Sequence, residues 1–172
     1  MCGIAGYFNP DQNYAENPKQ NFHTLSRMIN TMNHRGPDTY GHTIINSCCL
    51  AHTRLSIIDL ENGRQPMSYT KDGNTYYIVY NGEIYNYKEV KKTLLRKNYT
   101  FETNSDTEVI IAAFCHYGPG FVKELNGIFA IAIYDSMRNT LYLYRDRFGV
   151  KPLYYTKTGD TLVFASRIDT LL

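Results

Sequence analysis

Apolar residues recur along this chain with two different spacings, one typical of a helix and one typical of strands. Phe22, Leu25, Met28, Ile29 and Met32 are three or four positions apart, which predicts an amphipathic helix with one buried face. The polar stretch 13–20 before it is typical of a loop. Short apolar runs predict strands at 4–8, at 44–58 with a break near position 47, and at 76–80, 128–134, 141–145, 153–156 and 162–165.

Two further helices are predicted by the residues at their beginnings. Asn86 with Glu89, and Ser105 with Glu108, have the spacing of a capping box, in which two side chains satisfy helix amides reciprocally. The second of these helices would end at the Gly-Pro-Gly sequence at 118–120. One more helix is expected to begin at Ser166.

The order of these elements predicts the fold class. Turn sequences at 72–74, 135–139 and 147–149 separate consecutive strands, so we expect hairpins and therefore antiparallel sheets. With strands at both ends and helices between them, we predict an α+β protein in which helices cover two packed antiparallel sheets. The 172 residues fit a single domain spanning 1–172, which can bury roughly 70% of its unfolded surface.

Composition narrows the class of protein without identifying it. The formal charge of +2 comes from 18 basic and 16 acidic residues spread without runs, which predicts neither a nucleic-acid partner nor binding to a membrane surface. The longest apolar run, 128–134, is too short to cross a membrane, and no secretory leader is expected. Cys48, Cys49 and Cys115 lack metal-ligand spacing and are expected to be buried fillers in a cytoplasmic protein.

Cys2 is the first candidate for chemistry. If Met1 is removed, Cys2 carries a thiol and a free α-amine on one carbon, so the nucleophile brings its own base. An α-amine has an ordinary pKa of about 7.7–8.0 and is partly neutral near neutral pH. The alternative is that Cys2 is a small apolar residue whose position near the N-terminus has no functional meaning. Cys2 alone does not decide between the two interpretations.

Arg54 is the second candidate, because a planar guanidinium on an apolar strand is the right shape to hold a carboxylate bidentately. A surface arginine on a strand edge is the alternative. His52, on the same face of that strand, is expected to be a hydrogen-bonded packing residue, since no second metal ligand has a suitable spacing. The charged sequence at 34–38 is interpreted as a structural turn rather than a loop folded over the nucleophile.

Asn81, Gly82 and Glu83 follow a predicted strand. A glycine N–H and a neighbouring side-chain amide are the parts of an oxyanion hole, although an Asn-Gly pair is also a common turn. Glu83 contributes to such a site only if the substrate carries a cation. Asp106 opens a helix, where the helix dipole favours a carboxylate in any case.

Taken together, several ordered motifs resemble the glutaminase domain of class II glutamine amidotransferases. The similarity is strongest to the amino-terminal half of glutamine-hydrolysing asparagine synthetases and covers essentially all 172 residues. The motifs that carry it are Met1-Cys2-Gly3-Ile4, His34-Arg35-Gly36-Pro37-Asp38, Leu50-Ala51-His52-x-Arg54-Leu55-Ser56-Ile57, Gln65-Pro66, Asn81-Gly82-Glu83-Ile84-Tyr85-Asn86, Ser105-Asp106-x-Glu108 and Asp146-x-x-Gly149-x-Lys151-Pro152-Leu153-Tyr154.

The resemblance implies an αββα sandwich of the N-terminal-nucleophile hydrolase type and hydrolysis of glutamine through a γ-glutamyl thioester. It assigns a role to each candidate residue: Cys2 as nucleophile with its α-amine as proton shuttle, Asn81 and Gly82 as oxyanion donors, Arg54 for the α-carboxylate of glutamine, Glu83 and Asp106 for its α-ammonium, and the backbone of Leu55, Ser56, Ile57 and Ile58 as pocket lining. No metal is expected in this domain.

The chain also departs from the family pattern. Related enzymes usually continue Phe-Ala-Ser with Glu-Ile-Lys, whereas Arg167-Ile168-Asp169 reverses both charges here. No phosphate loop is found, so ATP and magnesium are expected only in a synthetase domain that is absent from this sequence. The end at Leu172, inside an expected helix, favours a fragment of a longer chain over a stand-alone domain.

The leading interpretation is therefore a glutaminase that supplies ammonia to an asparagine-forming synthetase domain or partner subunit. The alternatives are the glutaminase of a different amidotransferase, a non-catalytic glutamine-binding regulatory module, and a purely structural partner domain. Whether the chain forms a homodimer is left open by the sequence.

Overall fold

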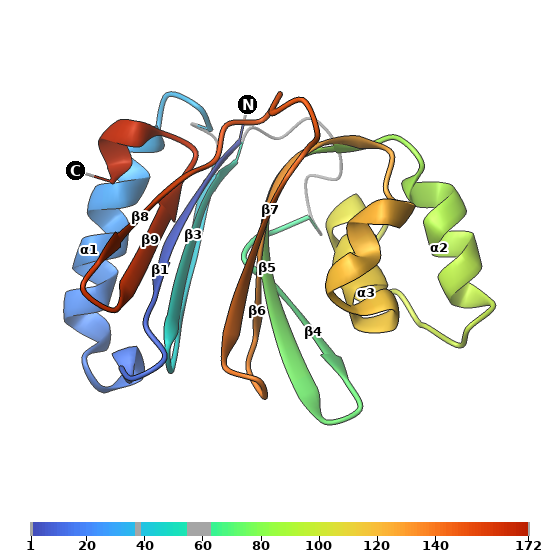
Figure 1. Cartoon of the computed structure of the whole chain (residues 1–172), viewed down its shortest axis with the longest axis horizontal. Helices are drawn as coiled ribbons and strands as arrows, with labels where there is room; N and C mark the ends of the chain where they lie inside the picture. The colour runs from blue at the N-terminus through green and yellow to red at the C-terminus, as the bar shows by residue number, and fades with distance from the viewer. Residues whose placement is uncertain (1, 37–38, 55–62, 172) are drawn as a thin grey trace.

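A computed structural model describes residues 2–36, 39–54 and 63–171 and has four layers (Figure 1). The first sheet has the strand order β2-β3-β1-β9-β8, and the second has the order β4-β5-β6-β7, with antiparallel pairing between neighbours. Helix α1 covers the outer face of the first sheet, and α2 and α3 cover that of the second. The predicted α+β sandwich is confirmed.

The strands are β1 (Gly3–Phe8), β2 (Thr39–Ile45), β3 (Cys48–Arg54), β4 (Met67–Lys71), β5 (Asn74–Ile84), β6 (Gly127–Asp135), β7 (Thr140–Arg145), β8 (Tyr154–Thr158) and β9 (Thr161–Ala165). The helices are α1 (Pro18–Met32), α2 (Tyr87–Leu95) and α3 (Asp106–Tyr117), with short 3₁₀ helices η1 (Tyr14–Glu16), η2 (Gly118–Glu124) and η3 (Ile168–Thr170).

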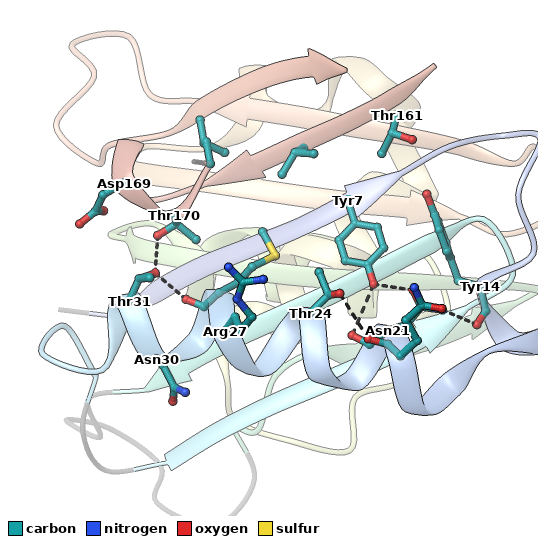
Figure 2. A pocket seen from close by; sticks show the side chains of 14 residues that line it. Tyr7, Tyr14, Asn21, Thr24, Arg27, Asn30, Thr31, Thr161, Asp169 and Thr170 are labelled. Carbon is teal, nitrogen blue, oxygen red and sulfur yellow. Dashed lines mark hydrogen bonds between the residues drawn. The ribbon is translucent and has the colours of Figure 1, made fainter. Parts of the chain in front are cut away.

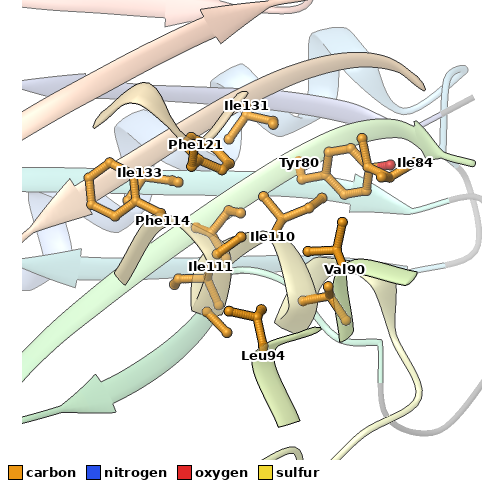
Figure 3. Packing of buried hydrophobic residues seen from close by; sticks show 14 of the residues in the cluster. Tyr80, Ile84, Val90, Leu94, Ile110, Ile111, Phe114, Phe121, Ile131 and Ile133 are labelled. Atoms are coloured by element: carbon orange, nitrogen blue, oxygen red, sulfur yellow. The ribbon is translucent and has the colours of Figure 1, made fainter. Parts of the chain in front are cut away.

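Three apolar clusters hold the layers together. Ile4, Leu50, Val79 and Phe164 belong to the cluster between the two sheets, while alternate residues of the same strands face outward toward the helices. The largest cluster joins the second sheet to α2 and α3, and Figure 3 shows Tyr80 and Ile84 of β5 beside Ile110 of α3. Adjacent Cys48 and Cys49 belong to clusters on opposite faces of β3.

Two element predictions at the ends of the chain are wrong. The stretch 13–20 is not simply a loop, because η1 lies in it and α1 begins at Pro18; proline suits the first turn of a helix, where its missing N–H costs no bond. The helix expected from Ser166 is only the three-residue η3. Ser166 instead extends the pairing with β1, since its backbone N–H donates to the Ile4 carbonyl and its Oγ accepts from the Ile4 N–H.

The capping boxes are also wrong in part. Asn86 makes no side-chain cap; its amide bonds the Asn126 N–H and the Glu124 carbonyl instead. Ser105 does cap α3 by accepting from the Thr107 N–H, but Glu108 does not complete the box. Its carboxylate accepts from the N–H groups of residues 102 and 103, which hold the segment before the helix.

The Asn81-Gly82 pair is not a turn. Strand β5 continues through it to Ile84, and Asn81 and Gly82 pair in register with Ala130 and Phe129 of β6. A Cβ on Gly82 would lie 2.2 Å from the Ile128 carbonyl oxygen, so glycine allows the two strands to approach here. The pair therefore lies on a rigid strand rather than on a flexible loop.

Candidate active site

Strand register brings the predicted residues of the first sheet to one edge. Gly3 of β1 pairs with Thr53 of β3, so Cys2, just before β1, and Arg54, the last residue of β3, lie at the same end of the sandwich. They occupy the even-numbered positions that carry Ile4 and Leu50, which face the second sheet. In Figure 1 the N-terminus marks this end of the molecule.

Strand β5 brings Asn81 and Glu83 to the same end. These residues alternate with Tyr80 and Ile84, which face α3, and share the side of Val79, which faces the first sheet. Asn81 is 3% exposed, and its side-chain nitrogen has no hydrogen-bond partner among the residues that the structure describes. A buried amide donor without a partner is costly unless a ligand or water completes it.

The backbone N–H of Gly82 points away from β6. Phe129, the residue opposite Gly82, directs its own N–H and carbonyl to Asp146 on the other side, so Phe129 and Gly82 form a non-hydrogen-bonded pair. On the far side of β5, the pairing with β4 begins only at Met67 and Ile78. Gly82 therefore presents a donor that neither neighbouring strand uses.

The donors on either side of Gly82 along this open edge are taken by side chains. The Tyr80 N–H donates to Gln65 Oε1 at 2.6 Å, and the Ile84 N–H donates to the carboxylate of Asp106. Gln65 also donates to Thr107 Oγ1 at 3.3 Å. Sequence reasoning gave no role to Gln65; the signal was the Gln65-Pro66 motif, which directly precedes β4.

A cavity of about 420 Å³ brings together every predicted site residue that the structure describes. These are Cys2, Arg54, Asn81, Gly82, Glu83 and Asp106. The cavity also contains Gln65, Tyr80, Asn104, Thr107 and Lys151, which sequence reasoning did not assign to the site. The predicted lining residues Leu55, Ser56, Ile57 and Ile58 lie outside the described residues.

Asp106 and its partner Tyr80 form the most perturbed pair in the cavity. Burial raises the pKa of Asp106, and the hydrogen bonds from the Tyr80 hydroxyl and from backbone N–H groups lower it only in part. The Tyr80 hydroxyl donates to Asp106 Oδ2 at 2.9 Å. Burial and the nearby Asp106 raise the pKa of Tyr80, so this phenol remains a hydrogen-bond donor.

Arg35 is a further residue that sequence reasoning missed. Its Nε donates to the Cys2 carbonyl at 3.3 Å, and a Cβ on Gly36 would lie 2.6 Å from the Arg54 backbone nitrogen. The turn therefore packs over the beginning of β1 and the end of β3, next to Cys2 and Arg54. Pro37 and Asp38 lie outside the described residues.

His52 behaves as a packing residue, as predicted. It lies between the sheets and is 1% exposed. Burial and the neighbouring Arg54 lower its pKa to about 4, so the imidazole is neutral at neutral pH. A hydrogen bond with the Tyr80 backbone opposes this shift. His52 thus links the two sheets behind the cavity without lining it.

The other cysteines differ from Cys2 in their surroundings. Burial raises the pKa of Cys49 to about 11 and that of Cys115 to about 12, and it also raises the pKa of Cys48. These thiols stay protonated at neutral pH and are poor nucleophiles. They do not line the 420 Å³ cavity; Cys48 and Cys49 are buried as expected, whereas Cys115 is only half-buried.

A larger cavity of about 600 Å³ lies between α1, β9 and η3 (Figure 2). It contains none of the predicted site residues. Its polar side chains bond one another: the Tyr7 hydroxyl donates to Asn21 Oδ1 at 2.9 Å, and the hydroxyls of Thr31 and Thr170 are 2.7 Å apart. Size alone does not identify the site in this molecule.

Residues 2–36, 39–54 and 63–171 contain neither a metal-ligand cluster nor a membrane-spanning helix. No three His, Cys, Asp or Glu side chains in these ranges gather in a group that could hold a metal ion. Within the same ranges, none of the helices has the length and apolar character needed to cross a membrane.

Comparison with known proteins identifies the family. The model of the glutamine amidotransferase domain matches residues 1–172. The chain is 41% identical over its full length to asparagine synthetase [glutamine-hydrolyzing] 3 of Bacillus subtilis (strain 168), and 39% identical to asparagine synthetase B [glutamine-hydrolyzing] of Escherichia coli (strain K12). The chain therefore belongs to the family of glutamine amidotransferase domains.

The extent of these matches also matters. The chain spans 27% of the B. subtilis relative and 30% of the E. coli relative, so both proteins are much longer than the matched region. Among solved structures, glutamine phosphoribosylpyrophosphate (PRPP) amidotransferase from B. subtilis aligns over 98% of this chain and 42% of its own, with a TM-score of 0.71 and 18% identity. That likeness supports the fold.

Proposed function

We propose that this domain hydrolyses glutamine to glutamate and ammonia in the 420 Å³ cavity. The observation that carries the proposal is the convergence of a cysteine, a guanidinium, two carboxylates, an Asn81 amide nitrogen without a partner among the described residues and a Gly82 N–H that neither neighbouring strand uses, all in one cavity. Glutamine requires this set, because its head group carries one anion and one cation and its side-chain amide needs a nucleophile and oxyanion donors.

The head group is held by charge. Arg54, only 8% exposed at the end of β3, binds the α-carboxylate of glutamine, for which a guanidinium offers two parallel donors. Glu83 and Asp106 accept hydrogen bonds from the α-ammonium.

The reaction has two steps. The Cys2 sulfur attacks the amide carbon of glutamine, and the negative oxygen of the tetrahedral intermediate accepts hydrogen bonds from the Asn81 side chain and the Gly82 N–H. The Cys2 α-amine, free once Met1 is removed, takes the thiol proton and passes it to the departing nitrogen, which leaves as ammonia. Water then attacks the γ-glutamyl thioester by the same route, which releases glutamate and restores the thiol.

The ammonia is consumed by a synthetase domain, in the same longer chain or in a separate subunit, that forms asparagine from aspartate. Support comes from the similarity to the two glutamine-hydrolysing asparagine synthetases and from the length that those proteins have beyond the matched region. ATP and magnesium act in that synthetase domain. A cytoplasmic location is proposed because ATP and aspartate are found there.

A second candidate function differs only in the molecule that accepts the ammonia. The chain is also 37% identical over its full length to amidase chyE of Penicillium rubens, of which it spans 26%. The glutaminase of an amidotransferase with another acceptor would keep the same cavity. The acceptor is therefore tested separately, by supplying aspartate and ATP to the full-length protein and measuring asparagine.

The experiment that tests the glutaminase is the release of glutamate and ammonia from glutamine by the domain, with the intact mass recorded to establish that Met1 is absent. We expect equal amounts of the two products. Glutamine binding without any release, from protein that begins at Cys2, would contradict the enzyme and support the regulatory glutamine-binding module.

A further inference from the structure

Tyr80 lies in β5, with its ring in the apolar cluster beneath α3 and its hydroxyl beside the cavity, and its chemistry is not used by the proposed reaction. Its ring is 3% exposed and packs in the cluster shown in Figure 3, beside Ile84 and Ile110. A buried tyrosine usually directs its hydroxyl to a hydrogen-bond partner. Here the partner is Asp106 Oδ2, at 2.9 Å, on the first residue of α3.

The hydrogen bond joins two elements that each contribute to the cavity. Tyr80 immediately precedes Asn81 on β5, and its own N–H is held by Gln65 Oε1 at 2.6 Å. The carboxylate of Asp106 also accepts from the Ile84 N–H, four residues further along the same strand. Tyr80 and Ile84 therefore hold Asp106 from both sides of Gly82.

We propose that Tyr80 is a positioning residue of the ammonium subsite: its hydroxyl holds the carboxylate of Asp106 against the cavity, where the α-ammonium of glutamine binds. The inference rests on the proposed function, since it assigns a second residue to the same glutamine site. Tyr80 does not touch the reacting amide, so its effect falls on substrate binding rather than on the chemical steps.

The electrostatic surroundings of Asp106 support this role. The charged or titratable groups that line the cavity with it are Cys2, Arg54, Glu83, Tyr85, Tyr87 and Lys151. On its own helix, Glu108 is occupied by backbone N–H groups and by the Thr103 hydroxyl. Burial raises the pKa of Asp106, and several hydrogen bonds lower it. Of these, the hydrogen bond from the Tyr80 hydroxyl has the largest effect.

The ionisation of Asp106 makes glutamine binding depend on pH. Asp106 attracts an ammonium only when it is ionised, so glutamine binding weakens as the pH falls through the pKa of Asp106. Removing the Tyr80 hydroxyl removes a bond to the ionised form and raises that pKa further. In Tyr80→Phe the acid limb of kcat/KM for glutamine therefore moves to higher pH, by about one unit, while kcat at saturating glutamine changes little.

The matched control is Tyr144→Phe. Tyr144 packs against the same cluster, and its hydroxyl makes one hydrogen bond, to the Pro119 carbonyl at 3.1 Å, away from the cavity. Both variants keep their rings, and thermal unfolding checks that each is folded. Tyr144→Phe should leave the acid limb and the KM for glutamine unchanged.

The test uses binding as well as turnover. In a Cys2→Ala background, calorimetry across pH compares glutamine with glutaramate, which lacks only the α-ammonium; carboxyl NMR follows the titration of Asp106 without ligand. We expect Tyr80→Phe to raise the Asp106 midpoint, to weaken glutamine about tenfold below it and to leave glutaramate unaffected. In an Asp106→Asn background, Tyr80→Phe should have no further effect on glutamine.

An unchanged Asp106 midpoint, or equal losses for glutamine and glutaramate, would overturn the role of Tyr80 while leaving the glutaminase intact. Failure of the parent Cys2→Ala protein to bind glutamine at any pH would instead contradict the proposed function, and the ammonium subsite with it.

Discussion

The two cavities of this domain differ in what their polar groups do. In the 600 Å³ cavity beside α1, the side chains bond one another: Asn21 joins Tyr7 to the Tyr14 carbonyl, and Thr31 bonds Thr170. In the 420 Å³ cavity at the end of the sandwich, the buried Asn81 amide has no partner among the described residues, and opposite charges lie around one space.

In this domain, unsatisfied polar groups rather than volume distinguish the candidate active site from the other cavity. Hydrogen bonds within the larger cavity stabilise the packing of α1 on its sheet, and none of the buried side-chain atoms that lack a partner among the described residues belongs to its lining. In the smaller cavity, desolvation of Asp106 and of the Asn81 donor lowers stability unless a zwitterion binds there. Mutations in the smaller cavity should therefore lower glutaminase activity, whereas mutations in the larger cavity should lower stability and leave activity unchanged.

The largest expected effect is that of Cys2→Ala, which should abolish glutamate release while leaving glutamine binding measurable by calorimetry. The nucleophile is lost, but the groups that hold the head group remain. Cys115→Ala is the matched control, since this half-buried thiol packs against the helical cluster and should leave turnover unchanged. Glutamine turnover that persists in Cys2→Ala would contradict the assignment of the 420 Å³ cavity as the active site.

Asn81→Ala should reduce kcat by about 100- to 1000-fold, because one oxyanion donor typically contributes ~3 kcal/mol to stabilising the transition state. Asn21→Ala removes an amide of the same size from the larger cavity. That variant should lower the melting temperature and leave kcat unchanged. Steady-state kinetics and thermal scans of both variants measure the contrast, and similar kinetic losses in both would contradict it.

Arg54→Lys should raise the KM for glutamine by about tenfold with a small change in kcat. A lysine keeps the charge but loses the paired donors that match a carboxylate, and such charge-assisted bonds contribute roughly 1.5–3 kcal/mol. Arg27, exposed on α1 at the larger cavity, is the matched position. If Arg27→Lys changed KM as much as Arg54→Lys does, Arg54 would have no special role.

The smallest effect is expected for Thr31→Val, which keeps the shape of the side chain and removes the hydrogen bonds to Thr170 and to the Met28 carbonyl. The free energy of unfolding should fall by about 1 kcal/mol, because the bond to Thr170 contributes a typical amount and a hydroxyl bond to the carbonyl of the same helix adds little. Chemical denaturation measures it. Glutamine kinetics should be unchanged, and a loss of activity comparable to that of Asn81→Ala would show that the larger cavity also serves the reaction.

Sequence periodicity predicted the fold well because most of its elements are amphipathic. The α1 stripe and the apolar strands each bury one face, so spacing alone indicates which residues meet the core. Local signals failed where tertiary contacts competed with them. Asn86 and Glu108 have capping-box spacing, yet both side chains satisfy loop backbone groups instead.

The site could be predicted only in part for a similar reason. Residue chemistry and family resemblance indicated Cys2, Arg54, Asn81 and Asp106, which the structure brings into one cavity. The contribution of Tyr80 depends on a hydrogen bond between residues 26 positions apart, and no spacing rule in the sequence reveals such a contact. Strand register, which comes from pairing across the sheet, likewise explains why the Gly82 donor is unused.

The most direct test of the smaller cavity is covalent labelling by a glutamine analogue that carries a chloroketone in place of the amide, read out by intact mass and peptide mapping. We predict a single adduct on the Cys2 sulfur that glutamine prevents and that Arg54→Lys slows. Labelling of Cys48, Cys49 or Cys115 instead, or labelling of Cys2 that glutamine does not prevent, would contradict the assignment of this cavity as the glutamine site.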